Sequence, residues 1–332
     1  MKRRAFLGGA AIFALTRASE AQREDTKRLG LLSPSSPPLP TTEPFRVRIR
    51  AALWNTLRGY GWTEGENLLV ERRYAHGDLD RLPALAAELV RLKVDLIYAP
   101  TGLAGLAAKA TTSSIPIVTN SGDMVRQGLV STLARPGANV TGQNVNSADV
   151  NVVAKRLQLL SETLGSRPLR VAIFGCGAGG AASDTRDNWA WPATESAARM
   201  FKFRLQPYSP TTLAEIDNAL REASKKADAL LLYDCSYFNA LDHTVFLQHR
   251  LPAMYPFEFF AHIGGLMAYG FDEVAFYERH AWYIDRILRG ANPAELPVEV
   301  AKFRFVFNLR TANELGLKVP EPVLLRADHV IR

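Results

Sequence analysis

The chain has 332 residues, of which 47% are hydrophobic and 22% are charged. This balance excludes a mainly disordered chain, a collagen-like repeat and a polytopic membrane protein. The formal net charge is +7, and part of the basic excess lies near the N-terminus. The rest of the chain is mildly basic without a run of Lys or Arg, so no nucleic-acid partner is predicted. A chain of this length predicts two domains.

The first residues have the order of an export signal. A basic segment at 2–4 precedes an uncharged, mostly apolar run at 5–15, and small residues stand at Ser19 and Ala21, just before Gln22. The apolar run is too short to span a bilayer and long enough for a signal peptide. The paired arginines also resemble a twin-arginine signal, so both Sec and Tat export remain open. The sequence therefore predicts a signal peptide over 1–21 and a mature, exported protein in a periplasm.

The first half of the mature chain alternates short apolar strands with amphipathic helices. The strands are predicted at 28–32, 68–74, 94–98, 115–118 and 140–142. The helices between them are predicted at 45–60, 80–92, 102–111 and 128–133. Strands and helices in alternation predict a parallel sheet covered on both faces.

A second, similar series follows. Its strands are predicted at 169–174, 203–208, 229–233 and 252–255, and its helices at 151–164, 193–201, 213–226 and 240–248. A strand at 265–270, a helix at 273–289, a strand at 303–307 and a helix at 311–315 complete the chain. The predicted fold class is α/β, with two doubly wound parallel-sheet lobes joined by a hinge. Lobe 1 is predicted to comprise 27–146 and 262–298, and lobe 2 to comprise 147–261 and 299–332.

Ligands of open parallel sheets bind beyond the carboxyl ends of the strands. Two facing lobes turn these ends toward each other, so an inter-lobe cleft is the predicted binding site. Polar groups expected there are Ser33, Ser35, Thr101, Gly102, Ser121, Gln143, Asn144 and Gly175. Thr101 and Gly102 open a helix, whose first backbone N–H groups suit a carboxylate.

Two acidic residues follow strands of opposite lobes, Asp123 and Asp234. Either carboxylate is suited to bind a ligand ammonium group, and either is equally suited to cap the N-terminus of a helix. Aromatic residues are dense along the predicted cleft edge of lobe 2. Among them Tyr237, Phe257 and Tyr269 are expected to stack on a planar or aromatic solute.

Several motifs resemble one known family. They are GYGWTEGEN at 59–67, DRLPALAAELV at 80–90, GLVSTLARPGANVTG at 128–142, GGLMAYG at 264–270, ILRGANP at 287–293 and NLRTA at 308–312. On these motifs the chain resembles the ABC transporter substrate-binding proteins of the tryptophan/tyrosine type, which have the type I periplasmic-binding-protein fold. The resemblance extends over 28–332. It implies a monomer that needs no cofactor, captures a small-molecule solute and delivers it to the transmembrane subunits of an ABC permease.

The cleft loops at 175–180 and 256–260 depart from the family's usual pattern, so the resemblance does not fix the solute. The first of these loops, GCGAGG, fits a dinucleotide-binding motif. The strand that follows it ends at 207–210 without an acidic residue, so nucleotide binding is not predicted.

Catalytic and metal-binding patterns are not found in the sequence. The six histidines are scattered, and neither H-E-x-x-H nor G-x-S-x-G occurs. No catalytic residue and no metal ligand is therefore predicted. Two alternatives to transport stay open: a ligand sensor that docks on a membrane receptor, and a secreted α/β enzyme that uses the same cleft.

The chain has two cysteines, and each follows a strand of the second series. Cys176 follows the strand at 169–174 and Cys235 the strand at 229–233. In a sheet of order 2-1-3-4-5 these strands are neighbours, about 4.8 Å apart. A disulfide needs Cα atoms about 4.4–6.8 Å apart, and an oxidising periplasm would preserve it. Either a disulfide or proximity without a bond is compatible with this placement.

Overall fold

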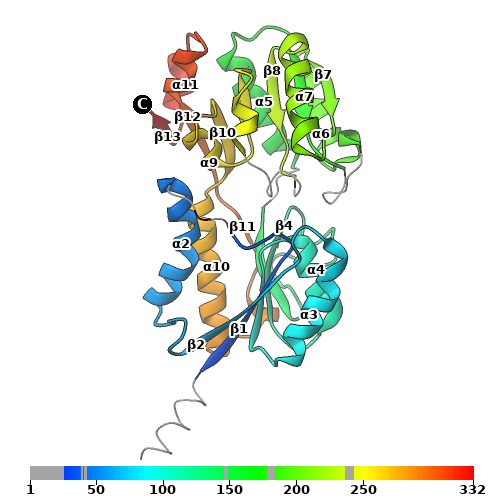
Figure 1. Cartoon of the computed structure of the whole chain (residues 1–332), viewed down its shortest axis with the longest axis vertical. Coiled ribbons are helices and arrows are strands. Elements are labelled where there is room, and N and C mark those ends of the chain that lie inside the picture. The colour runs from blue at the N-terminus through cyan, green and yellow to red at the C-terminus, as the bar shows by residue number, and fades with distance from the viewer. Residues whose placement is uncertain (1–25, 39, 41–42, 146–148, 178–183, 236–242) are drawn as a thin grey trace, which may run out of the picture.

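The structure is a computed structural model that describes residues 26–38, 40, 43–145, 149–177, 184–235 and 243–332. The predicted signal peptide at 1–21 and the predicted site residue Tyr237 lie outside these residues. The chain forms two lobes, one above the other in Figure 1, each built on its own sheet. Within the described ranges no helix has the length and apolarity needed to cross a membrane.

Lobe 1 contains a six-stranded parallel sheet of order β11-β5-β4-β3-β1-β2. Its strands are β1 (Lys27–Ser33), β2 (Leu68–Tyr74), β3 (Leu96–Ala99), β4 (Ile117–Ser121), β5 (Val140–Asn144) and β11 (Glu299–Val300). Its helices are α2 (Pro44–Gly59), α3 (Leu82–Arg91), α4 (Gly102–Thr111) and α10 (Glu273–Leu288). Helices α2 and α10 lie side by side on one face of the sheet, and α3 and α4 cover the other (Figure 1).

Strand β3, in the middle of the lobe 1 sheet, is apolar and buried on both faces because helices cover both of them. Along β3 the side chains alternate between two cores. Ile97 packs with the residues of α3 and α4, whereas Leu96 and Tyr98 pack with the residues of α2 and α10. Each fully buried aliphatic side chain contributes about 1.5–3 kcal/mol, so these two layers hold the sheet and its helices together.

Lobe 2 contains a seven-stranded sheet of order β13-β12-β10-β9-β8-β6-β7. Its strands are β6 (Arg170–Phe174), β7 (Arg204–Tyr208), β8 (Ala229–Leu232), β9 (Ala253–Tyr255), β10 (Met267–Phe271), β12 (Phe303–Asn308) and β13 (His329–Ile331). Its helices are α5 (Val150–Thr163), α6 (Trp191–Met200), α7 (Leu213–Lys226), α9 (Glu258–His262), α11 (Leu309–Glu314) and α12 (Glu321–Leu325). Strand β12 runs antiparallel to β10, and the other pairs are parallel. The first five strands of this lobe follow the predicted order 2-1-3-4-5.

Two predicted helices differ from the structure. Residues 128–133 are not helical, because Gly128 has a φ of 70°, which an α-helix does not allow. Of the helix predicted at 240–248, the described part is a 3₁₀ helix at His243–Leu247. Further 3₁₀ turns lie at Leu79–Arg81, Thr185–Asp187 and Pro293–Glu295.

The first passage between the lobes follows β5, close to the predicted boundary at 146, but the other two passages differ from the prediction. Strand β10 belongs to the sheet of lobe 2, although 262–298 were assigned to lobe 1, and β11 belongs to the sheet of lobe 1. The three passages follow β5, β10 and β11. They are joined by hydrogen bonds from Ala301 N to Asn144 O (2.9 Å) and from Asp272 N to Lys302 O (2.8 Å). Three adjoining backbone segments of this kind form a hinge between the lobes.

Candidate functional site: a cleft between the lobes

A cleft with a volume of about 500 Å³ lies between the two lobes and is lined by both. Seven of the predicted site residues line it: Ser33, Ser35, Thr101, Gly102, Ser121, Asp234 and Phe257. All of them follow, end or neighbour the carboxyl end of a parallel strand, which is the position that the sheet topology predicts for a ligand.

The N-terminus of α4 forms part of the lobe 1 wall. Thr101 is the N-cap residue, and its hydroxyl accepts a hydrogen bond from Ala104 N (3.3 Å). A Cβ atom on Gly102 would lie 2.7 Å from Oε1 of Gln127 and 3.3 Å from Cβ of Ser121, so the start of the helix packs closely on these two side chains. The N-terminus of α4, which is the positive end of its helix dipole, therefore lies at the surface of the cleft.

Five predicted site residues do not line the cleft. Asp123 accepts a hydrogen bond from Arg126 N (2.9 Å) and so stabilises a turn, since no helix starts at this position. The Asn144 side chain accepts from Met124 N (2.8 Å), and Gln143 is buried within β5. The remaining two residues pack within lobe 2. Gly175 is buried, and a Cβ atom added to it would lie 2.8 Å from the Tyr233 side chain. The ring of Tyr269 lies 5.6 Å from the ring of Phe303.

Sequence reasoning missed the contribution of the two helices next to the hinge. Helix α2 supplies Arg46, Ile49 and Arg50, and the start of α10 supplies Glu273, Phe276 and Tyr277. Asn120, Gln127, Asn188, Trp189, Phe259 and Phe271 also line the cleft. The amphipathic pattern of α2 predicted a core-facing helix. Only the pairing of the lobes shows that its first turns reach the cleft.

Aromatic side chains form a continuous wall along the hinge side of the cleft. The rings of Phe257 and Phe271 meet edge to face at 5.6 Å, and Phe271 lies 4.6 Å from Phe276. Phe257 also stacks against Phe259 at 6.2 Å. Phe257 is held at this position because Gly270 packs on Pro256, where an added Cβ would lie 1.8 Å from the Pro256 carbonyl oxygen. Such a wall suits a planar ligand.

Asp234 is the acidic residue that lobe 2 presents to the cleft from the end of β8. Burial raises the pKa of its carboxyl to about 6, and the charge of Arg156 partly opposes the shift. Arg156 is itself buried, with its Nε donating to Tyr269 O (2.9 Å), and burial lowers its pKa to about 10. The Asp234 carboxylate therefore already has a cationic neighbour within the protein.

Glu273 is the first residue of α10, at the hinge, and is buried. Its Oε2 accepts a hydrogen bond from Phe259 N (3.1 Å). Burial raises the pKa of Glu273 to about 8, and Glu258 and Asp272 add to the effect, whereas the Phe259 N–H and Arg46 oppose it. The carboxyl of Glu273 is therefore mostly protonated at neutral pH.

The two lobes also contact each other directly around the cleft. On the hinge side the ring of Phe45, from α2, stacks on His262 of lobe 2 at 4.0 Å. Elsewhere the guanidinium of Arg126, from lobe 1, lies 5.3 Å from the ring centre of Trp189 in lobe 2. These contacts are made by side chains, so rotation at the hinge can break and remake them.

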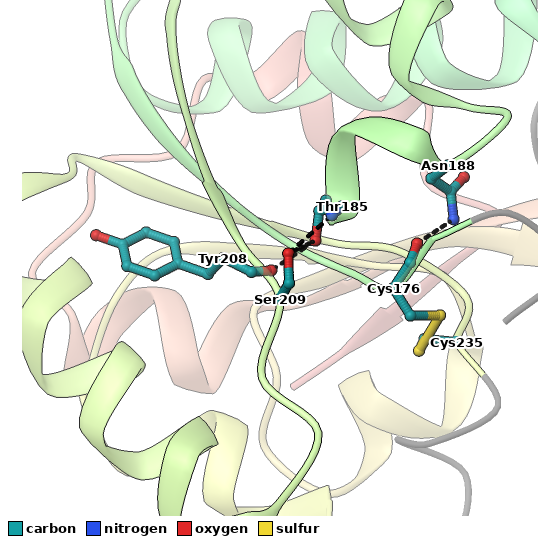
Figure 2. Close-up of a disulfide and its surroundings, with 6 residues drawn as sticks. All are labelled: Cys176, Thr185, Asn188, Tyr208, Ser209 and Cys235. Atoms are coloured by element: carbon teal, nitrogen blue, oxygen red, sulfur yellow. Dashed lines mark hydrogen bonds between the residues drawn. A yellow bond between two sulfur atoms is a disulfide. The ribbon is translucent and has the colours of Figure 1, made fainter. Parts of the chain in front are cut away.

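A disulfide joins Cys176 and Cys235 at the carboxyl ends of β6 and β8 (Figure 2). Their Cα atoms are 5.9 Å apart, which agrees with the spacing of neighbouring strands. Asn188 Nδ2 donates to Cys176 O (2.8 Å), and Asp234 directly precedes Cys235. The bond therefore ties together two backbone segments that support the lobe 2 wall of the cleft.

A second hollow, with a volume of about 800 Å³, lies on lobe 2 between α5 and the end of α6. It reaches Ser166 and Pro168, which precede β6 and so lie where the parallel strands begin. It is larger than the cleft, but it lies away from the carboxyl ends of the strands and from lobe 1. Across the described ranges no group of His, Cys, Asp and Glu is placed to hold a metal ion.

The protein has two lobes built on mostly parallel sheets, three chain segments that connect them and a cleft at the strand ends. This arrangement is that of a bilobal ligand-binding protein with the type I periplasmic-binding-protein fold. The family model of the ABC transporter substrate binding proteins matches residues 40–331. The chain therefore belongs to this family, whose members generally work outside the cytoplasm.

Comparison with solved structures agrees with this fold. A conserved domain protein from Vibrio cholerae has a TM-score of 0.75 at 23% identity, over 92% of this chain and 99% of that one. An ABC domain in complex with L-Trp from Streptococcus pneumonia also has a TM-score of 0.75, at 20% identity, over 92% of this chain and 100% of that one.

Among curated proteins, a tyrosine-binding protein of Clostridioides difficile is 32% identical over 119 residues. The match spans 36% of this chain and only about a third (33%) of the length of that relative.

Proposed function

We propose that this protein is the solute-binding component of an ABC importer. It captures a small aromatic or amino-acid-like solute in the inter-lobe cleft and delivers it, as a monomer, to the transmembrane permease subunits. The observation that carries the proposal is the aromatic wall of a cleft that both lobes line. Family membership, the L-Trp complex of one structural relative and the tyrosine-binding name of another relative support it.

Binding would act through closure of the hinge. The solute first docks on one lobe and contacts the second lobe only when the cleft shuts. A ligand shifts such an equilibrium by its differential affinity for the two states, so contacts from both walls are what drive closure. The closed form would then be the one that the permease recognises.

A thermal-shift screen of the mature protein tests this function. Aromatic amino acids and aromatic acids are expected to raise the melting temperature, because a ligand that binds only the folded state stabilises it by an amount that grows with the ratio of ligand concentration to Kd. Exclusive stabilisation by sugars or other non-aromatic polar solutes would contradict the aromatic specificity.

Replacement of Phe257 by alanine is expected to weaken solute binding by about 1–3 kcal/mol, the contribution of a large apolar side chain buried against a ligand. Isothermal titration calorimetry measures the change. Phe201→Ala is the matched control, since Phe201 lies in lobe 2 but outside the cleft. Equal affinities of the two variants would show that Phe257 does not contact the solute.

The export step is part of the same proposal. The basic, apolar and small-residue segments of the leader predict removal of residues 1–21, so the mature protein in a periplasmic fraction should begin at Gln22. N-terminal sequencing or intact mass measurement checks this. A cytoplasmic protein that keeps Met1 would contradict both the signal peptide and the periplasmic location.

A further inference from the structure

Trp189 differs from the other aromatic residues of the cleft. It lines the cleft from the segment of lobe 2 just before α6 and is half-buried. The rings of Phe257 and Phe276 both pack on Phe271, at 5.6 Å and 4.6 Å. Trp189 has no such partner among the rings that the structure describes, and its indole N–H meets no acceptor there. Part of this ring is therefore open to a solute.

The backbone on both sides of Trp189 is fixed by Asn188. The Asn188 side chain accepts a hydrogen bond from Ala190 N (2.9 Å) and donates one to Cys176 O (2.8 Å; Figure 2). Cys176 is joined by the disulfide to Cys235, so the tryptophan stands beside the ends of β6 and β8. A ring on such a support loses little conformational freedom when a ligand binds, which favours affinity.

Arg126 contacts Trp189 from the opposite lobe, with its guanidinium 5.3 Å from the centre of the indole ring. Arg126 lies in the turn after β4, where its own N–H donates to Asp123 Oδ1 (2.9 Å). It is exposed and forms no ion pair with any residue that the structure describes. An unpaired guanidinium is attracted by an aromatic face, and the attraction is strongest for tryptophan. The contact therefore favours the arrangement in which the two lobes meet.

This contact lies away from the hinge. In the sheet of lobe 2, β8 and β9 separate β6 from β10, which is the strand before one of the hinge passages. Three strand spacings of about 4.8 Å place the end of β6 about 14 Å from the end of β10. A small rotation at the hinge moves a point at this distance by several ångströms, so the contact between Arg126 and Trp189 is lost when the cleft opens.

We propose that Trp189 gives the cleft its aromatic specificity by stacking on the ring of the solute, and that Arg126 positions the indole for this contact. Arg126 does not line the cleft, so the side of the indole that faces the cleft is left to the solute. Both contacts need the lobes together, so the solute and Arg126 stabilise the same closed state. The inference rests on the proposed function and adds the lobe 2 residue that selects a planar ring.

The test compares solutes of similar size whose ring is either planar and aromatic or saturated. The pairs are phenylalanine with cyclohexylalanine and phenylacetate with cyclohexylacetate, and free tryptophan is measured beside them. Isothermal titration calorimetry on the full mature protein gives each affinity. The aromatic member of a pair is expected to bind about 3- to 10-fold more tightly, the range for an aromatic contact beyond its buried area.

Variants of Trp189 locate the origin of this preference. Trp189→Leu keeps apolar surface without an aromatic face, so it should abolish the preference and weaken binding of tryptophan about 3- to 10-fold. Trp189→Phe keeps a ring and should retain part of the preference. Trp282→Leu is the matched control, because Trp282 also lies near a guanidinium, that of Arg279 (3.6 Å), but does not line the cleft.

A double-mutant cycle tests the positioning role of Arg126. Arg126→Gln is expected to weaken binding of the aromatic solutes about 2- to 5-fold, the range for an exposed cation–π contact. In the Trp189→Leu background the same substitution should cause no further loss, because the ring through which it acts is gone. Arg135→Gln is the matched control, since Arg135 is exposed on lobe 1 and does not line the cleft. Thermal unfolding checks that each variant is folded.

The outcomes separate this inference from the proposed function. Equal affinities within both pairs, a preference that survives in Trp189→Leu, or an unchanged affinity of that variant for tryptophan would overturn the inference and leave the proposed function in place. A further loss from Arg126→Gln in the Trp189→Leu background would overturn the positioning role of Arg126. Binding of non-aromatic polar solutes alone would reject the proposed function together with the inference.

Discussion

Removal of the Cys176–Cys235 disulfide is expected to lower the free energy of unfolding by about 2–4 kcal/mol, the usual contribution of a native disulfide. The two cysteines are 59 residues apart in the sequence, and the bond closes a loop that contains α6, β7, α7 and β8 of lobe 2. A cross-link of this span restricts the unfolded chain strongly. The double variant Cys176→Ala, Cys235→Ala removes the bond without leaving a reactive thiol.

Chemical denaturation with and without a reducing agent measures the effect. The wild-type protein should lose stability when reduced, whereas the double variant should be insensitive to the reductant. A free-thiol assay on denatured, unreduced protein provides the control for bond formation. Two titratable thiols in the wild-type protein, or a variant as stable as the oxidised wild type, would contradict this prediction.

The same bond matters for the cleft. It holds the segment that positions Asp234 and, through the hydrogen bond from Asn188 to Cys176, the segment next to Trp189. The hinge passages follow β5, β10 and β11, so the bond leaves hinge rotation free. The double variant is therefore expected to bind solute more weakly while still closing, because the lobe 2 wall becomes less ordered.

Most of the fold could be predicted from the sequence because its strands are short, apolar and separated by amphipathic helices. The helices at Gly102–Thr111 and Leu213–Lys226 and the strand at Leu68–Tyr74 have the predicted bounds. The lobe boundary could not be predicted in the same way. Strand β10 and helix α10 belong to different lobes, yet they are separated by one residue, Asp272, whose local sequence is that of an ordinary helix cap.

The site was predictable only where it depends on local sequence. Thr101, Gly102 and Asp234 lie within three residues of the ends of parallel strands, so the strand pattern alone places them at the cleft. Arg50 and Glu273 come from helices on the hinge side. Their position depends on how α2 and α10 pack together and on where the chain passes between lobes, and neither is encoded in a short motif.

The stability of this protein is expected to fall with rising pH between about pH 6.5 and 8, and Glu273 is the cause. Its pKa is raised to about 8 by burial, above the ordinary value of about 4.3. In this interval the folded protein retains a proton that the unfolded chain has already released. The stability that the protonated group contributes is complete below the unfolded pKa and is lost as the pH rises through the folded pKa.

Two other buried groups act at lower pH. Burial lowers the pKa of His280 to about 3, so protonation of this histidine in the unfolded chain reduces stability as the pH falls below about 6.5. The pKa of Asp234 is raised to about 6, so its contribution makes stability fall as the pH rises, mostly below pH 6.5. The interval above pH 6.5 therefore isolates Glu273 from both of these groups.

Glu273→Gln is expected to remove this pH dependence, because the amide keeps an oxygen that can accept the Phe259 N–H and carries no charge. Relative to the wild type, the variant should gain about 2 kcal/mol in the free energy of unfolding between pH 6.5 and 8, since each pH unit below the folded pKa corresponds to about 1.4 kcal/mol. Urea denaturation at several pH values measures the difference. Glu278→Gln, on the exposed face of the same helix, is the matched control and should follow the wild type. A constant difference between Glu273→Gln and the wild type across this interval would mean that Glu273 is ionised throughout, and the hinge side of the cleft would then carry a negative charge.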